Sequence, residues 1–184
     1  MKKYIFGSVF ACIFLCCGTS RNTYHSKIYH KIYNCQGIDI KLLNQNRKHP
    51  RYVKIQMDNI NKLIQWDYLA KLNYSKENDT IYILEMDGIQ GDFFFTVWNK
   101  NDTLSYTNEP GKLMQTEQRL FTKYMMKLVS DWNIPEIRRE EKINKVNLPE
   151  EIIYATKITF NKGKYFIDCF TFNDFFNLKR DGVD

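Results

Sequence analysis

The chain of 184 residues carries 27 lysines and arginines against 21 acidic residues, which gives a formal net charge of +6. Its hydrophobic content of 43% is ample for one folded core and excludes global disorder. The basic residues are scattered, and glutamates flank the one arginine doublet, Arg138-Arg139, whereas nucleic-acid binding requires a patch of one sign. We therefore expect one globular domain that does not bind nucleic acid.

The N-terminus has the pattern of an export signal. Lys2 and Lys3 precede the uncharged run Tyr4–Leu15, and a positive start followed by a short apolar run is typical of a secretory signal peptide. After Leu15 the uncharged stretch is diluted by Gly, Ser, Cys and Thr, while a spanning helix needs about 20 predominantly apolar residues. A cleaved signal over residues 1–16 is favoured, and an uncleaved membrane anchor is the alternative.

The end of this run, Phe14-Leu15-Cys16-Cys17-Gly18, resembles the lipobox of bacterial lipoproteins. Cys17 has an apolar residue three positions upstream and a small residue directly before it, as the lipobox requires. Cys16 is the alternative, with the bulky Leu15 before it, and Phe14 stands where the lipobox usually has leucine. The resemblance implies a lipid-modified Cys17 that anchors the protein to a membrane of the cell envelope, on the periplasmic side or in the outer membrane. Several acyl chains on one cysteine give a stable anchor.

Residues 17–31 are polar and show no strong hydrophobic period, which predicts a lipidated tether followed by a domain over residues 32–184. Cys35 and Cys169 are the two cysteines left in that domain. Such cysteines can pair outside the cytoplasm, but Cys169 lies in an apolar predicted strand, and free cysteine is among the most buried residue types. We predict that the two form no essential disulfide.

The first half of the domain is predicted to be mainly strands. The segment 58–73 fits both the four-residue spacing of a helix and the alternation of a strand, and its good helix formers favour a helix. Turn residues separate the clearer strands that follow. In chain order the prediction is a weak strand at 38–42, a loop at 44–50, a strand at 52–57, and then Thr80–Glu85, Asp92–Trp98 and Thr103–Thr107.

The second half is predicted to hold the main helix. Apolar residues recur at three- and four-residue intervals over Leu113–Trp132, with Phe121, Tyr124 and Leu128 expected to be most buried, and Pro135 ends the pattern. A charged helical turn and linker, a second hairpin and a short helix follow, at 136–145, 151–172 and 173–178. These elements predict an α+β fold, a mainly antiparallel β-sheet built of hairpins packed against one long amphipathic helix.

No catalytic, cofactor or metal motif is recognisable in the sequence. The phosphate-binding glycine patterns, the hydrolase nucleophile elbow, HExxH and zinc-type cysteine spacings are all absent. The three histidines His25, His30 and His49 lie in the first fifty residues. A nucleophile pair of Cys35 with His30 or His49 lacks the third group that would orient the base.

Carboxylates offer the other catalytic hypothesis, because two of them flanking a sugar bond can hydrolyse it. Glu85 and Asp87 lie at one strand end, and Asp92 lies across the following turn. Acidic residues beside a turn are ordinarily solvated, so we expect these to be solvated. We therefore predict no catalytic residue, no metal site and no cofactor.

Two tripeptides, Asp79-Thr80-Ile81 and Asp102-Thr103-Leu104, resemble the Asp-(Ser/Thr)-aliphatic acceptor of the O-glycosylation system in Bacteroides-like bacteria. The resemblance implies O-glycosylation at Thr80 and Thr103. The alternative is that both tripeptides are ordinary hairpin turns.

Two functions remain open at this point. The first is a non-enzymatic envelope protein that is held by its lipid anchor and binds another envelope protein or a small-molecule ligand. The alternative is an envelope hydrolase of low motif content that uses carboxylates or Cys35.

Overall fold

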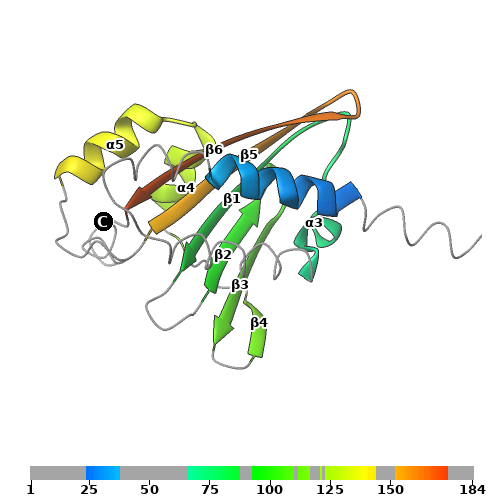
Figure 1. The fold of residues 1–184 in the computed structure, drawn as a ribbon, viewed down its shortest axis with the longest axis horizontal. Coiled ribbons are helices and arrows are strands. Elements are labelled where there is room, and N and C mark those ends of the chain that lie inside the picture. The colour runs from blue at the N-terminus through cyan, green and yellow to red at the C-terminus, as the bar shows by residue number, and fades with distance from the viewer. Residues whose placement is uncertain are drawn as a thin grey trace, which may run out of the picture.

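The computed structural model describes residues 24–37, 66–87, 93–109, 112–116, 121, 123–143 and 152–173. Within them six strands form one antiparallel sheet in the order β4-β3-β2-β1-β5-β6 (Figure 1). The α+β class with a sheet built of antiparallel hairpins is confirmed. The strands are β1 (Asn78–Asp87), β2 (Phe93–Trp98), β3 (Thr103–Glu109), β4 (Lys112–Thr116), β5 (Ile152–Asn161) and β6 (Lys164–Asn173).

The central strand β1 sets the two faces of the sheet. Its Ile83 lies opposite Val97 of β2 and Thr156 of β5. Because successive side chains of a strand point to opposite faces, Ile81 and Ile83 share one face while Leu84 lies on the other. The two faces accordingly carry separate core clusters.

The turn between β5 and β6 consists of Lys162 and Gly163 and lies within the hairpin that the sequence predicts at 151–172. Both residues have positive φ, 50° and 74°. A two-residue hairpin of this type needs positive φ at both positions, which glycine adopts freely. The two turn amides donate to the carbonyls of Glu77 and Lys76, at 2.9 and 3.0 Å. These bonds hold the hairpin tip against the segment that precedes β1.

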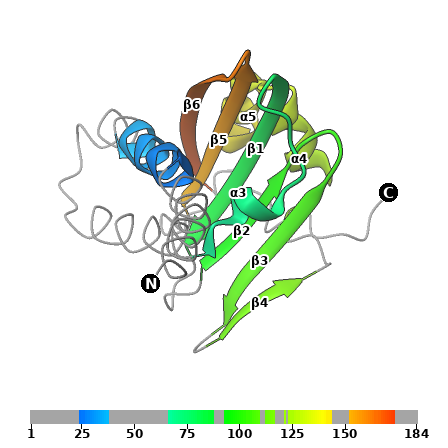
Figure 2. The ribbon, with the colours of Figure 1, turned by 90° about the vertical axis from the view of Figure 1, so that its right-hand side faces the viewer.

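One face of the sheet is covered by a helix over residues 24–37 together with the short helix α3 (Tyr68–Lys71). Figure 2 shows the 24–37 helix on one side of the sheet and the helices α4 and α5 on the other. The core on the first face consists of Ile28, Tyr29, Ile32, Tyr68, Leu69, Leu72, Ile81, Ile83, Phe95, Val97, Tyr106, Ile158 and Phe160.

The helix over residues 24–37 corrects the predicted boundary between tether and domain. The predicted tether runs to residue 31, yet Ile28 and Tyr29 are 0% and 1% exposed inside the core. The reason is that the helix buries a narrow stripe, Ile28, Tyr29 and Ile32, among polar residues. Lys27 and His30 face solvent, so the segment reads as polar although its inner side is apolar. The folded domain begins no later than residue 24.

The other face of the sheet is covered by α4 (Lys123–Ser130) and α5 (Ile134–Ile143). Their apolar side chains pack on Leu84 of β1 and Ala155 of β5. The core on this face consists of Leu84, Trp98, Phe121, Met125, Met126, Leu128, Val129, Ile137, Ile153, Ala155, Phe170 and Phe172.

The prediction of one long helix over Leu113–Trp132 is wrong. Lys112–Thr116 is strand β4, which pairs antiparallel with β3, and α4 begins only at Lys123. A short run of apolar residues whose spacing fits a helix can equally form an edge strand of a sheet. In the sequence the turn-forming pair Pro110-Gly111 stands directly before β4. The predicted burial of Phe121 and Leu128 is confirmed. The predicted burial of Tyr124 is wrong, because its side chain is 42% exposed.

Backbone hydrogen bonds explain why α4 stops and α5 begins. Trp132 adopts a positive φ of 51°. Its amide donates to the carbonyl of Val129, and the amide of Asn133 donates to that of Leu128, which is the Schellman arrangement of a helix C-terminus. Asn133 then caps α5, because its side-chain oxygen accepts from the amide of Glu136 at 3.3 Å.

Several other predictions can be placed. The strands at Thr80–Glu85 and Thr103–Thr107 are confirmed, as are β2 from Phe93 and the second hairpin from Ile152. Of the ambiguous segment 58–73, the described part contains α3, so the helical alternative holds there. The strands at 38–42 and 52–57, the loop at 44–50 and the helix at 173–178 lie outside the described residues, apart from the β6 end at Asn173.

We expect α4 to be a structural helix. Truncating Leu128, which is 8% exposed, should lower the free energy of unfolding by about 2–3 kcal/mol, the lower part of the usual range for core truncations. Lys127→Ala on the exposed side of the same helix is the matched control and should change it by less than about 0.5 kcal/mol. Thermal melts of both variants check this. An unchanged melting temperature for Leu128→Ala would assign the helix to an interface instead.

Candidate functional site

The 24–37 helix is joined to the rest of the domain by a partly buried polar cluster near its start. His25 Nδ1 lies 2.8 Å from Asp67 Oδ1, and His25 Nε2 lies 3.1 Å from the hydroxyl of Tyr74. The Tyr29 hydroxyl donates to the same oxygen of Asp67 at 2.8 Å and accepts from the amide of Leu69 at 3.1 Å. We call these side chains, His25, Tyr29, Asp67 and Tyr74, the His25 cluster.

The His25 cluster has the order carboxylate, imidazole, hydroxyl that general-base catalysis uses. A carboxylate only accepts, so the Nδ1 atom that faces Asp67 is the donor of that contact. Burial raises the pKa of Tyr29, with the negative charge of Asp67 adding to the effect, so Tyr29 stays a hydrogen-bond donor at neutral pH. His25 itself is only 5% exposed.

The backbone at Asp67 reflects the same contacts. Asp67 has a φ of 41° and a ψ of 55°, the left-handed conformation that aspartate adopts more readily than most residues. It is the residue before α3, yet its side chain makes no capping bond there and instead binds His25 and Tyr29. The cluster therefore fixes α3 against the 24–37 helix, and within the described residues we assign it a positioning role.

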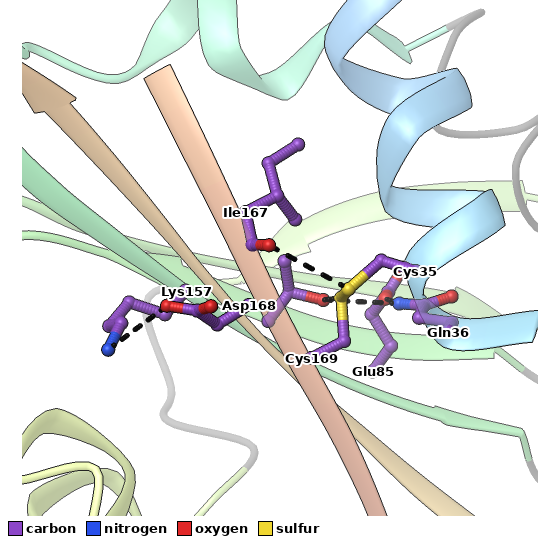
Figure 3. Close-up of a disulfide and its surroundings, with 8 residues drawn as sticks. Cys35, Gln36, Glu85, Lys157, Ile167, Asp168 and Cys169 are labelled. Atoms are coloured by element: carbon purple, nitrogen blue, oxygen red, sulfur yellow. Dashed lines mark hydrogen bonds and ion pairs between the residues drawn. A yellow bond between two sulfur atoms is a disulfide. The ribbon is translucent and has the colours of Figure 1, made fainter. Parts of the chain in front are cut away.

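A second polar cluster lies near the end of the same helix (Figure 3). The side-chain amide of Gln36 donates to Glu85 Oε2 on β1 and lies 3.2 Å from the hydroxyl of Thr156 on β5. Glu85 is 3% exposed, and Gln36 is 5% exposed. We call Gln36, Glu85 and Thr156 the Glu85 cluster.

The burial of Glu85 corrects the expectation that it is solvated. Glu85 stands on the same face of β1 as Ile81 and Ile83, and the 24–37 helix covers that face. A buried carboxylate is costly unless a donor satisfies it, and Gln36 supplies one. The side chain of Asp87, and the whole of Asp92, lie outside the described residues.

Cys35 and Cys169 form a disulfide beside the Glu85 cluster, with their Cα atoms 5.9 Å apart (Figure 3). The prediction that Cys35 and Cys169 form no essential disulfide assumed that they lie apart, and this placement is wrong. Cys35 lies in the last turn of the 24–37 helix, which the sequence placed near the tether, and Cys169 lies on β6. The helix packs across the sheet and brings together two residues that are 134 positions apart. Thr156 Oγ1 lies 3.7 Å from the sulfur of Cys169.

The disulfide removes the proposed cysteine nucleophile from the described structure. A thiolate is the nucleophilic form of cysteine, and Cys35 has its sulfur bonded to Cys169. His30, one of its two suggested bases, is exposed to solvent. The other, His49, and the lipidation candidates Cys16 and Cys17 lie outside the described residues.

The two candidate glycosylation threonines lie on strands, and each directly follows an aspartate that binds its amide. Asp79 and Asp102 each accept a hydrogen bond from the amide of the following threonine, at 2.8 and 2.9 Å. Thr80 is half-buried within β1, whereas Thr103 is exposed at the start of β3. Both aspartates therefore have a structural role, and the side chain of Thr103 is more exposed than that of Thr80.

Sequence reasoning missed both polar clusters. His25 and Asp67 are 42 residues apart, and Gln36 and Glu85 are 49 apart. No spacing rule connects such pairs, because the packing of the 24–37 helix on the sheet creates them. The only local signal is a polar residue at an otherwise apolar face of a strand, as at Glu85.

Comparisons with known proteins return no match: no protein-family model, no curated protein and no solved structure is similar to this chain. In the described part of the chain, no three His, Cys, Asp or Glu side chains gather in a way that could hold a metal ion. The helices described there include none long and apolar enough to cross a membrane.

We expect Gln36→Leu to lower the free energy of unfolding by about 2–3 kcal/mol, because it removes a donor from a buried carboxylate. The double variant with Glu85→Leu should be less destabilised than the sum of the two single variants, since no buried charge is then left behind. Urea denaturation of the two single variants and the double variant measures this coupling. Asn34→Leu, at an exposed position of the same helix, is the control. If the losses in free energy of unfolding are additive, Gln36 and Glu85 do not interact directly.

Proposed function

We propose that this protein is exported and lipid-anchored at Cys17, with Cys16 as the alternative, and acts in the cell envelope as a non-enzymatic binding or structural protein. The observation that carries the proposal is the Cys35–Cys169 disulfide. Disulfides form and persist in oxidising compartments outside the cytoplasm and are rare inside it. The bond and the signal-like N-terminus are independent features that favour the same location.

The non-enzymatic part of the proposal is supported by how the buried polar groups are used. His25 and Asp67 bind each other and tyrosine hydroxyls, and Glu85 binds Gln36. These contacts join the 24–37 helix to the sheet, to the start of α3 and to the segment before β1. The alternative, a hydrolase using Cys35, would require the disulfide to be reduced first. A hydrolase using carboxylates would need Glu85 to leave its buried position.

Metabolic labelling with an alkyne analogue of palmitate tests the anchor. The wild-type chain should incorporate the label and fractionate with membranes, Cys16→Ser should keep the label, and Cys17→Ser should lose it. The double variant Cys16→Ser, Cys17→Ser is the control for acylation elsewhere. Label retained by the double variant, or absent from the wild type, would contradict lipidation at this site.

A further inference from the structure

We propose that the end of the sheet where the 24–37 helix begins docks onto the anionic headgroups of the membrane that holds the lipid anchor. This inference rests on the proposed function, because it requires lipidation at Cys17. The partner is a lipid surface. The groups that contact it are lysines of the segment before β1, of the β2–β3 turn and of the β5–β6 hairpin, together with the exposed ring of Phe166.

The first argument is chain length. Six residues, Gly18 to Thr23, separate the lipidated cysteine from the start of the described helix at Tyr24. A chain rises at most about 3.6 Å per residue, so this link spans no more than roughly 25 Å even when fully extended. That is less than the ~30 Å diameter of a small domain. The anchor therefore keeps the Tyr24 end of the domain close to the bilayer.

The second argument is what surrounds Tyr24. The Lys76 ammonium lies 4.0 Å from the centroid of the Tyr24 ring, and the rings of Tyr24 and Tyr165 lie 5.9 Å apart. The β5–β6 turn is bonded to the Lys76–Glu77 backbone. Figure 1 shows the start of the helix, the start of β1 and the β5–β6 turn at the same end of the sheet.

The turn between β2 and β3 lies at the same end of the sheet. The side-chain amide of Asn99 donates to the carbonyl of Asn73 and to Asp79 Oδ2, at 2.8 and 3.1 Å. These bonds join the β2–β3 turn to the segment before β1. The residues 73–77, 99–102 and 161–164 thus form one surface, which we call the tip.

Charge complementarity favours an anionic lipid surface. The tip carries four exposed lysines, and its only acidic side chains are Glu77 and Asp102. Each lysine held near an anionic leaflet contributes about fivefold to a docking equilibrium. The four lysines are Lys76, Lys100, Lys162 and Lys164.

Phe166 supplies the apolar contact. It is 61% exposed on β6, two residues after Lys164, and β6 is an edge strand. Among the described residues the other exposed large hydrophobic side chain is Tyr124, which belongs to α4. Aromatic rings inserted at headgroup level, beside lysines, are typical of surfaces that lie on a membrane.

The test places a fluorescent probe on each of these two exposed aromatic positions in the processed protein. Phe166→Cys and Tyr124→Cys each introduce one free thiol, because Cys35 and Cys169 are bonded to each other and Cys17 is lipidated. The labelled proteins are reconstituted into nanodiscs of phosphatidylcholine with or without phosphatidylglycerol. With phosphatidylglycerol, the probe at position 166 should be shielded from iodide and quenched by lipids with headgroup-level nitroxides. The probe at position 124 should stay open to iodide.

The lysines are tested by Lys76→Gln, Lys162→Gln and Lys164→Gln combined. This variant should lower the ratio of docked to undocked protein about 100-fold, as three fivefold losses predict, and so expose the probe at position 166. The matched control is Lys123→Gln, Lys127→Gln and Lys142→Gln, which should leave the shielding unchanged. Melting temperatures check that both variants fold.

Each outcome is decisive for the docking proposal. Shielding that depends on phosphatidylglycerol and on the tip lysines supports it. Equal exposure of both probes overturns it, and so does shielding that is the same in both lipids, which would indicate a second copy of the chain as the occupant. Palmitate labelling of the same preparations distinguishes failure of the docking proposal from failure of the proposed lipid anchor. A labelled protein whose probe at position 166 stays accessible to iodide contradicts docking alone. An unlabelled protein contradicts the proposed function as well.

Discussion

Removing the Cys35–Cys169 disulfide should lower the free energy of unfolding by about 4–5 kcal/mol, the largest loss we expect from any single bond in this domain. The bond closes a loop with a sequence separation of 134 residues, so it strongly restricts the unfolded chain. A loss of that size approaches the whole stability of a typical domain, about 5–15 kcal/mol. Guanidinium denaturation of the oxidised and reduced protein measures the difference.

The control for this experiment is the double variant Cys35→Ala, Cys169→Ala. It should unfold at the same denaturant concentration as the reduced wild-type protein, and added reductant should leave it unchanged. An oxidised wild type that unfolds at the midpoint of the double variant would contradict a stabilising role for the bond.

Ile28→Ala should lower the free energy of unfolding by about 3–4 kcal/mol, within the usual range for truncating a fully buried aliphatic side chain. Ile28 is 0% exposed and packs in the core cluster that includes Ile81 and Phe95. Thermal and urea unfolding of the variant measure the loss. The result decides whether the domain begins before residue 32, because a residue in a tether would tolerate the change.

Lys27→Ala provides the matched control for Ile28→Ala. Lys27 is its neighbour in the same helix and faces solvent, so its loss should change stability by less than about 0.5 kcal/mol. If both substitutions lower the free energy of unfolding by the same small amount, residues 24–31 belong to the tether and not to the folded domain.

The hairpins are the part of the fold that local sequence predicts well. Alternating residues between turn formers specify β1, β2, β3, β5 and β6, because strand period and turn chemistry both act over a few neighbouring residues. The turn at Lys162-Gly163 shows this most clearly, since its glycine supplies the positive φ that the hairpin requires.

The helices show where local patterns fail. Leu113 fits the helical stripe as well as it fits β4, and only the pairing of β4 with β3 distinguishes the two. The 24–37 helix was missed for the opposite reason, because its buried stripe is narrow and polar residues surround it. Helical stability in such segments comes largely from tertiary packing, which a single segment does not contain.

By itself the sequence determined the α+β class, the order of the hairpins and the export-signal pattern of the N-terminus, since each of these depends on residues close together in the chain. Only the tertiary structure decided that Cys35 meets Cys169, that His25 meets Asp67 and that Glu85 is buried beneath Gln36. The physical reason is the same in all three cases. The 24–37 helix packs across the sheet. This long-range contact, and not any local spacing, determines which side chains meet in each of the three places.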